Sequence, residues 1–231
     1  MLDSNTYKSF AKDVLGLDFN DIQLLITAFT HRSYVNEHKK TVKEHNERLE
    51  FLGDAVLELV VTEHLYLNFP EPEGILTNWR SALVRTESIG AAAVRLGFEP
   101  LLRLSRGEKR GTARARSQIL ANSFEAVIGA IYLDKGYEAS KQFITDSILS
   151  TFDEILETGS WQDPKSHLQE VIQSEAGSTP HYRVLSEEGP DHDKNFTVGV
   201  YVDDRVIGEG QGPSKQAAQV AAAEMALKKY K

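Results

Sequence analysis

The sequence predicts two parts of different fold class: an all-α N-terminal part and a small α+β C-terminal part with the order α-β-β-β-α. Up to about residue 155, apolar residues recur at helical spacing and the alternation typical of strands is scarce. The segment TGSWQDP (158–164) then interrupts the helical pattern. After it, apolar residues alternate strictly with others, as in a strand with one buried face: Phe196, Val198, Val200 and Val202.

Each part is built from segments bounded by turn residues. In the C-terminal part, Asp163 and Pro164 form a typical helix start, and Ser214 is placed to cap a last, Ala-rich helix. Between these helices we expect three strands, HYRVLSEE, NFTVGVYVDD and RVIGEGQG. We expect domains at 1–157 and 163–231 and a linker at 158–162. Helices of the first domain are expected at 20–36, 46–68, 74–95, 117–133 and 137–157.

The composition limits the classes of function. The chain has no cysteine, which excludes a disulfide scaffold, a thiolate metal site and a cysteine nucleophile. Its net charge of −8 means that a polyanionic partner must be met by local basic patches. The N-terminus has no signal-peptide pattern, and no apolar run approaches the roughly 20 residues needed to cross a bilayer. We therefore expect a soluble cytoplasmic protein without a membrane partner.

Two expected helices carry acidic residues that their apolar surroundings do not explain. In NERLEFLGDAVLEL (46–59), four carboxylates fall within a stripe roughly 80° wide on a helix that is otherwise largely apolar. An interior glycine, Gly53, costs such a helix roughly 1 kcal/mol relative to alanine, which indicates close approach of another helix or a ligand. In SQILANSFEAVIGAIYL (117–133), Asn122 and Glu125 share one face.

Crowded carboxylates repel one another unless a cation lies among them. Oxygen ligands without histidine or cysteine suit Mg²⁺ or Mn²⁺ rather than zinc. Such an ion can catalyse phosphodiester hydrolysis, because it activates water and stabilises the leaving oxygen. The acidic stripe is therefore interpreted as a metal site.

The sequence also resembles a known family. HNERLEFLGDAVLEL resembles the signature helix of the ribonuclease III family. Members of this family are metal-dependent endonucleases that act on double-stranded RNA. TAFTHRSY (27–34), EGILTNWRSALV (73–84) and ILANSFEAVIGAIYLDKG (119–136) resemble further family segments in the same order. The C-terminal part, with HLQEVIQ, EEGPDH and GEGQGPSKQAA, is similar to a double-stranded-RNA-binding domain. The resemblance covers nearly the whole chain and implies an all-α endonuclease domain followed by an RNA-binding domain.

The resemblance assigns roles to the acidic residues. Glu50, Asp54 and Glu125 match the family's catalytic, metal-binding acids, with Mg²⁺ as cofactor and Mn²⁺ as a substitute. Asn122 stands where the family usually has aspartate. Its amide oxygen can still serve as a metal ligand, although one charge is lost. We therefore expect activity to persist with a higher metal requirement.

Other positions match residues that contact the RNA or the partner subunit. Glu47 and Glu73 match acids that line the RNA cleft, and Phe51 matches a residue that plugs into the second subunit of a symmetric homodimer. An alternative is that Phe51 belongs to the core of its own chain. The strongest basic cluster, RLSRGEKRGTARARS (103–117), is expected to bind phosphates through Arg106, Lys109 and Arg110. In the C-terminal domain the expected RNA contacts are Gln169, Glu170, His192 and Lys215.

The expected function is metal-dependent hydrolysis of both strands of double-stranded RNA. The resemblance implies products with 5′-phosphate and 3′-hydroxyl ends and a role in maturing ribosomal and messenger RNA precursors. The alternative is a double-stranded-RNA-binding protein of the same fold with weakened or lost chemistry, an idea that rests on Asn122. A DNA-directed nuclease would require a C-terminal domain that ignores the 2′-hydroxyl, which this kind of domain does not.

Overall fold

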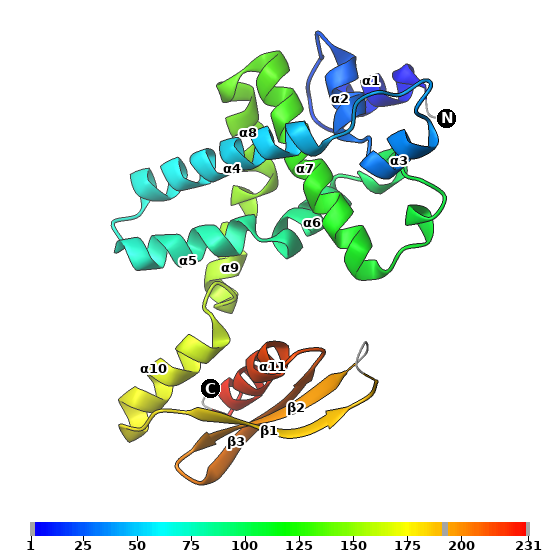
Figure 1. Cartoon of the computed structure of the whole chain (residues 1–231). Helices are drawn as coiled ribbons and strands as arrows, with labels where there is room; N and C mark the ends of the chain where they lie inside the picture. Colours follow the sequence, from blue (N-terminus) through cyan, green and yellow to red (C-terminus); the bar gives the residue numbers. More distant parts are fainter. Residues whose placement is uncertain (1–2, 191–193, 230–231) are drawn as a thin grey trace. The chain divides into compact units, whose positions relative to one another are not determined.

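The computed structural model describes residues 3–190 and 194–229, and the chain divides into two compact units, Met1–Trp161 and Gln162–Lys231 (Figure 1). The first unit is helical and the second has the order α-β-β-β-α, which confirms the predicted fold class. In the described part of the chain, no helix combines the length and the apolar character that crossing a bilayer requires.

The first unit consists of α-helices and short 3₁₀ turns, and its longest helices are α4 and α7. Its elements are α1 (Ser4–Asp13), α2 (Ile22–Ala28), α3 (Arg32–Glu37), α4 (Glu47–Asn68), α5 (Glu73–Val84), α6 (Thr86–Arg95), η1 (Glu99–Leu101), η2 (Glu108–Arg110), α7 (Ala113–Lys135), α8 (Tyr137–Ser147), η3 (Leu149–Thr151) and α9 (Phe152–Thr158).

Four of the expected helical segments are divided or begin elsewhere, among them 137–157, which forms α8, η3 and α9. The segment 20–36 splits into α2 and α3 because Thr30 leaves the helix to form a β-bridge with Arg103. The segment 74–95 splits into α5 and α6 at Arg85, whose backbone is extended. Helix α7 begins at Ala113 rather than 117, because the Thr112 side chain accepts a hydrogen bond from the Ala115 N–H. Helix α1 was not among the expected segments.

The core of the first unit forms where α4 crosses α7 (Figure 1). Each helix buries an apolar face, and Phe124 of α7 is fully buried. Two glycines let the backbones touch. A Cβ atom on Gly53 would overlap the backbone carbonyl of Glu125, and one on Gly129 would overlap the carbonyl of Leu49. The expectation that Gly53 marks the close approach of another helix is confirmed.

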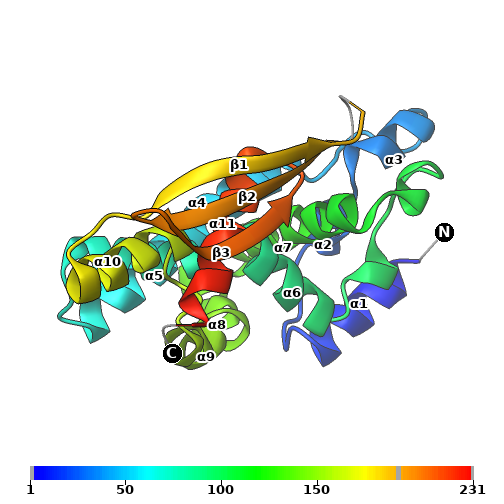
Figure 2. The ribbon, with the colours of Figure 1, turned by 90° about the horizontal axis from the view of Figure 1, so that it is seen from below.

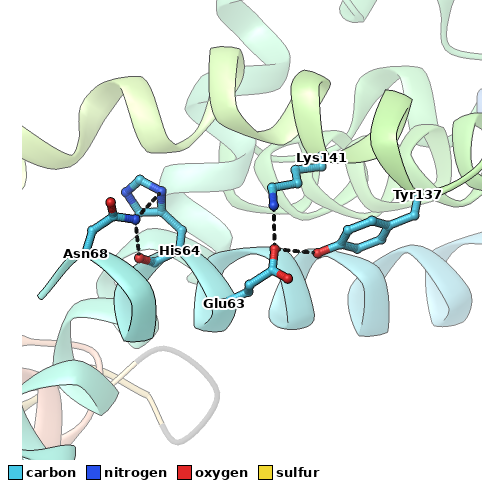
Figure 3. Close-up of polar contacts among 5 residues, drawn as sticks. All are labelled: Glu63, His64, Asn68, Tyr137 and Lys141. Carbon is cyan, nitrogen blue, oxygen red and sulfur yellow. Dashed lines mark hydrogen bonds and ion pairs between the residues drawn. The ribbon is translucent and has the colours of Figure 1, made fainter.

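Polar contacts fix the second half of α4 against α8 (Figure 3). The Glu63 carboxylate accepts hydrogen bonds from the Tyr137 hydroxyl at 2.8 Å and from the Lys141 ammonium at 2.6 Å. The hydrogen bond from Lys141 lowers the pKa of Glu63 below its ordinary value. On the next turn, Asn68 donates to the backbone carbonyl of His64. The contacts of Glu63 with Tyr137 and Lys141 therefore hold the second half of α4 against α8.

The second unit is a three-stranded antiparallel sheet with two helices. Its elements are α10 (Pro164–Ala176), β1 (His181–Glu188), β2 (Asn195–Val202), β3 (Arg205–Gly212) and α11 (Lys215–Leu227), and the strand order is β1-β2-β3 (Figure 2). The predicted caps are confirmed, because Asp163 accepts from the Ser166 N–H at 2.9 Å and Ser214 from the Ala217 N–H at 3.1 Å. Val198 and Val200 are fully buried, as the alternation predicted.

The glycine contacts at the helix crossing predict an unequal response to alanine. Gly53→Ala should lower the free energy of unfolding by about 3 kcal/mol or more, because the added methyl group must push the two helices apart. Gly74→Ala in α5 is the matched control, since its Cβ would meet no atom within 4 Å. The control should be neutral or more stable by up to about 1 kcal/mol. Urea unfolding measures both, and equal effects would contradict the crossing geometry.

Candidate active site

The α4–α7 crossing brings the acids of two distant segments together. Glu50 and Asp54 project from α4, and Glu125 projects from α7 at the point where its own backbone meets Gly53. Burial raises the pKa of Glu125 to about 8, and the charges of Asp54 and Glu50 add to the shift. Burial and the charge of Glu47 likewise raise the pKa of Glu50. These carboxyl groups therefore occupy one electrostatic environment.

The donor set fits a hard divalent cation. Carboxylates with a nearby amide oxygen are the ligands that Mg²⁺ and Mn²⁺ prefer. Burial, and next the neighbouring carboxylates, raise the pKa of Glu50 and Glu125, so a cation would favour the ionised form of both acids. Within residues 3–190 and 194–229, however, no three acidic or histidine side chains already form a group able to hold an ion.

Asn122 lies in this cluster, half-buried, as a hydrogen-bond donor to Glu50, and this bond partly offsets the raised pKa of Glu50. A carboxylate can only accept, so the NH₂ group of Asn122 must face Glu50. Its Oδ1 atom then accepts from Nε2 of Gln118 at 2.7 Å. Sequence reasoning missed Gln118, although its spacing of four residues from Asn122 on one helix was a usable signal.

Of the two acids assigned to the RNA cleft, Glu47 lies at the start of α4 and Glu73 lies beyond the other end of that helix, at the start of α5. Glu47, one turn before Glu50, pairs with Arg32 at 3.2 Å. Glu73 begins α5 and lines a hollow together with Thr62 and other residues from the far half of α4. Twelve residues of helix separate Thr62 from Glu50, roughly 18 Å along the axis. A single chain therefore does not bring Glu73 to the acidic cluster.

The basic stretch 103–117 divides into internal and exposed cations. Arg103 lies over the ring of Tyr34, 4.5 Å from its centroid, and Arg116 pairs with Glu99 at 3.5 Å. The cations left exposed on the loop before α7 include all three that were expected to bind phosphate: Arg106, Lys109 and Arg110.

Phe51 is not part of the core of its own chain, because 82% of its surface is exposed. It stands at the edge of a cavity of about 780 Å³ that is partly apolar, with Leu24, Leu52 and Leu133 in its wall. An exposed aromatic side chain beside an apolar cavity is typical of an interaction surface.

In the second unit, Gln169 and Glu170 are exposed on α10 and line a shallow hollow with Ser166. Lys215 pairs with Glu187 at 2.9 Å and lies over the ring of Phe196. His192 lies outside the described residues. The positions of Gln169, Glu170 and Lys215 at the surface leave them accessible to a ligand.

The fold and the acidic cluster indicate a class of protein, an endoribonuclease joined to a double-stranded-RNA-binding domain, and comparisons with known proteins bear this class out. Residues 21–152 match the "Ribonuclease-III-like" family, and residues 164–230 match the "Double-stranded RNA binding motif". The chain is 47% identical over 221 residues to ribonuclease 3 of Enterococcus faecalis and 46% identical over 221 residues to that of Streptococcus gordonii. Each alignment covers 94% of both chains.

A solved structure adds a match in three dimensions. The nuclease domain of ribonuclease III from Campylobacter jejuni superposes with a TM-score of 0.56 at 39% identity, covering 62% of this chain and 97% of that one. This chain belongs to the ribonuclease III family. It is an endoribonuclease, and double-stranded RNA is its partner.

The raised pKa of Glu125 predicts a pH dependence of stability without metal. Between about 4.5, the ordinary pKa, and about 8, the folded protein keeps a proton that the unfolded chain releases. Stability should therefore fall as pH rises through this window, and Glu125→Gln should remove that fall. From pH 4.5 to pH 9, the free energy of unfolding of wild type should fall by on the order of a few kcal/mol more than that of the variant.

Urea unfolding in EDTA at the two pH values measures this difference. Glu138→Gln, which changes an exposed carboxylate on α8, serves as the control and should behave as wild type. If wild type and Glu125→Gln lose the same stability between the two pH values, Glu125 does not carry the shifted proton.

Proposed function

We propose that this chain is a Mg²⁺-dependent endoribonuclease that hydrolyses both strands of double-stranded RNA and leaves 5′-phosphate and 3′-hydroxyl ends. The observation that supports it is the proximity of Glu50 and Asp54 on α4 to Glu125 on α7, whose pKa their charges raise. When bound, Mg²⁺ or Mn²⁺ would activate water and stabilise the leaving oxygen. The proposed work is the processing of ribosomal and messenger RNA precursors in the cytoplasm.

The side chains have distinct tasks in this proposal. Glu50, Asp54 and Glu125 would hold the ion, and Glu125 would release its proton as the ion binds, because ligands must be deprotonated. Asn122 keeps Glu50 oriented in the absence of metal by donating a hydrogen bond to it. To become a ligand itself, Asn122 would have to turn its oxygen away from Gln118. This cost supports the expected higher metal requirement.

Cutting two strands with one acidic cluster per chain calls for two chains, and we propose a symmetric homodimer. In a two-fold interface each chain presents the same patch, so a cavity beside Phe51 can receive the partner's copy of that side chain. The region of dimer formation named for the Campylobacter jejuni domain is consistent with this. If the axis runs perpendicular to α4, the paired helices are antiparallel, and the Glu73 end of one faces the Glu50 end of the other.

RNA would be held by both units. Arg106, Lys109 and Arg110 would bind phosphates of the same duplex, since their loop leads directly into α7, the helix that carries Glu125. In the second unit, Gln169, Glu170, His192 and Lys215 would read the A-form minor groove and its neighbouring phosphates.

The alternative, an RNA-binding protein with weakened chemistry, rests on one observation. Asn122 occurs in the acidic cluster as a donor rather than as a fourth carboxylate. Retention of Glu50, Asp54 and Glu125 opposes a complete loss of activity. We therefore propose that Asn122 raises the metal concentration that cleavage requires and does not abolish the reaction.

Metal dependence separates these two functions. With a labelled RNA duplex, wild type should cleave only when Mg²⁺ or Mn²⁺ is present, and Glu125→Gln should be slower by roughly 100-fold or more at fixed Mg²⁺. Asn122→Asp should reach half-maximal rate at about tenfold lower Mg²⁺, because it restores a charge to the cluster. Identical metal titrations for Asn122→Asp and wild type would contradict the role given to Asn122. Binding without cleavage, even in Mn²⁺, would support the alternative.

The dimer proposal predicts an effect of Phe51 on association but not on folding. Phe51→Ala should weaken self-association by about 30-fold or more, since a central aromatic anchor is worth about 2 kcal/mol or more. Its stability as a monomer should barely change, because the side chain is exposed in one chain. Analytical ultracentrifugation measures the change. Val94→Ala, an exposed apolar residue on α6, is the control; equal association of the two variants would rule out this interface.

A further inference from the structure

We propose that Ser33 and Glu37 of α3 form a clamp that holds the start of the basic loop, residues 105–110, in place for RNA phosphates. They are positioning residues, since neither is expected to touch RNA or the acidic cluster. The inference builds on the proposed phosphate contacts of the basic loop, and it assigns a task to helix α3, which the catalytic proposal leaves without one.

In the clamp, two consecutive backbone amides donate hydrogen bonds to side chains of α3. The Ser105 N–H donates to Oγ of Ser33 at 3.1 Å. The Arg106 N–H lies 3.3 Å from both carboxylate oxygens of Glu37 and donates to them. Ser33 and Glu37 are four residues apart on α3, so they share one face of the helix. The two acceptors are thus one helical turn apart on α3 and face consecutive amides of the loop.

The Ser33 hydroxyl is oriented for this task by His31. The His31 side chain caps α3 by accepting the Ser33 N–H at its Nδ1 atom, 3.3 Å away. Because Nδ1 is therefore an acceptor, the Ser33 hydroxyl, at 2.8 Å from it, must donate its proton there. The lone pairs of Oγ remain free to accept from Ser105. Nδ1 of His31 thus accepts from both the N–H and the hydroxyl of Ser33, and the direction of each bond follows from this.

Helix α3 is itself tied to the strand-like segment that precedes the loop. The His31 N–H donates to the Arg103 carbonyl at 3.1 Å, and the Arg103 N–H donates to the Phe29 carbonyl at 2.8 Å. The Arg103 guanidinium lies over Tyr34 of the same helix and donates to the Thr30 hydroxyl at 3.0 Å. The clamp therefore has a rigid base.

The contacts continue from the clamp to the exposed cations. Oγ of Ser105 accepts from the Glu108 N–H at 3.1 Å, which starts the 3₁₀ turn that carries Lys109 and Arg110. At the other end, the Arg116 guanidinium donates to the Lys109 carbonyl at 3.0 Å. The loop is thus held at both ends.

The clamp and simple electrostatics predict opposite effects of removing Glu37 on RNA binding, so the inference can be tested. A carboxylate beside Arg106 repels phosphate, so on electrostatic grounds removing Glu37 should strengthen RNA binding. If Glu37 positions the loop, removing its acceptor should weaken binding instead. Glu37→Ala removes both the charge and the acceptor, whereas Glu37→Gln removes the charge but keeps a carbonyl oxygen that can accept.

The experiment measures steady-state cleavage of an RNA duplex in Mg²⁺ and amide hydrogen exchange across residues 105–110 of the full chain. Glu37→Ala and Ser33→Ala should raise KM by about threefold to tenfold each, the loss of a typical hydrogen bond, with kcat unchanged. Both should speed exchange in the loop. Glu37→Gln should keep the KM and the exchange of wild type, or lower KM. Glu138→Ala, on α8, controls for the loss of one exposed carboxylate.

Unchanged loop exchange in Glu37→Ala and Ser33→Ala, or a KM for Glu37→Ala at or below that of Glu37→Gln, would overturn the clamp. Failure of the wild-type chain to cleave duplex RNA is a different result, since it would refute the proposed function. In that case the exchange measurement still decides whether Ser33 and Glu37 hold the loop.

Discussion

The structure depends on a backbone-to-backbone contact between α4 and α7. Gly53 and Gly129 each lie against a carbonyl of the opposite helix, and any side chain at either position would separate the helices. Since Gly53 meets the backbone of Glu125 itself, the contact that closes the core also sets the distance from Glu125 to the acids of α4. Folding and site assembly are thus one event, and the basic loop and its clamp lead into the same helix.

Burying Glu125 close to the acids of α4 has an electrostatic cost. Burial together with Asp54 and Glu50 raises the pKa of Glu125 to about 8, so the metal-free protein keeps an acid near neutral pH that the unfolded chain would ionise. Unfavourable local choices of this kind are expected at functional sites, where the surrounding fold must supply compensation. Here the compensation comes from the buried apolar faces of α4 and α7 and from the Glu63 contacts with α8.

Features with local signals were predictable from the sequence. Neighbouring residues determine the caps at Asp163 and Ser214 and the alternation in β2. Gly53 indicated a close approach because a glycine inside a helix lowers its stability. Features that depend on distant partners were not. The break at Thr30 exists because of Arg103, far along the chain, and the acceptors for Ser105 and Arg106 lie on α3. The basic stretch likewise gave no sign that Arg103 and Arg116 are used internally.

The central claim is that a hard cation replaces repulsion among Glu50, Asp54 and Glu125. A crystal structure of the chain grown with Mn²⁺, with data collected for anomalous scattering, tests it most directly. The account predicts a manganese peak coordinated by carboxylate oxygens from both α4 and α7. Manganese bound through only one of the two helices, or at a different place on the first unit, would contradict it.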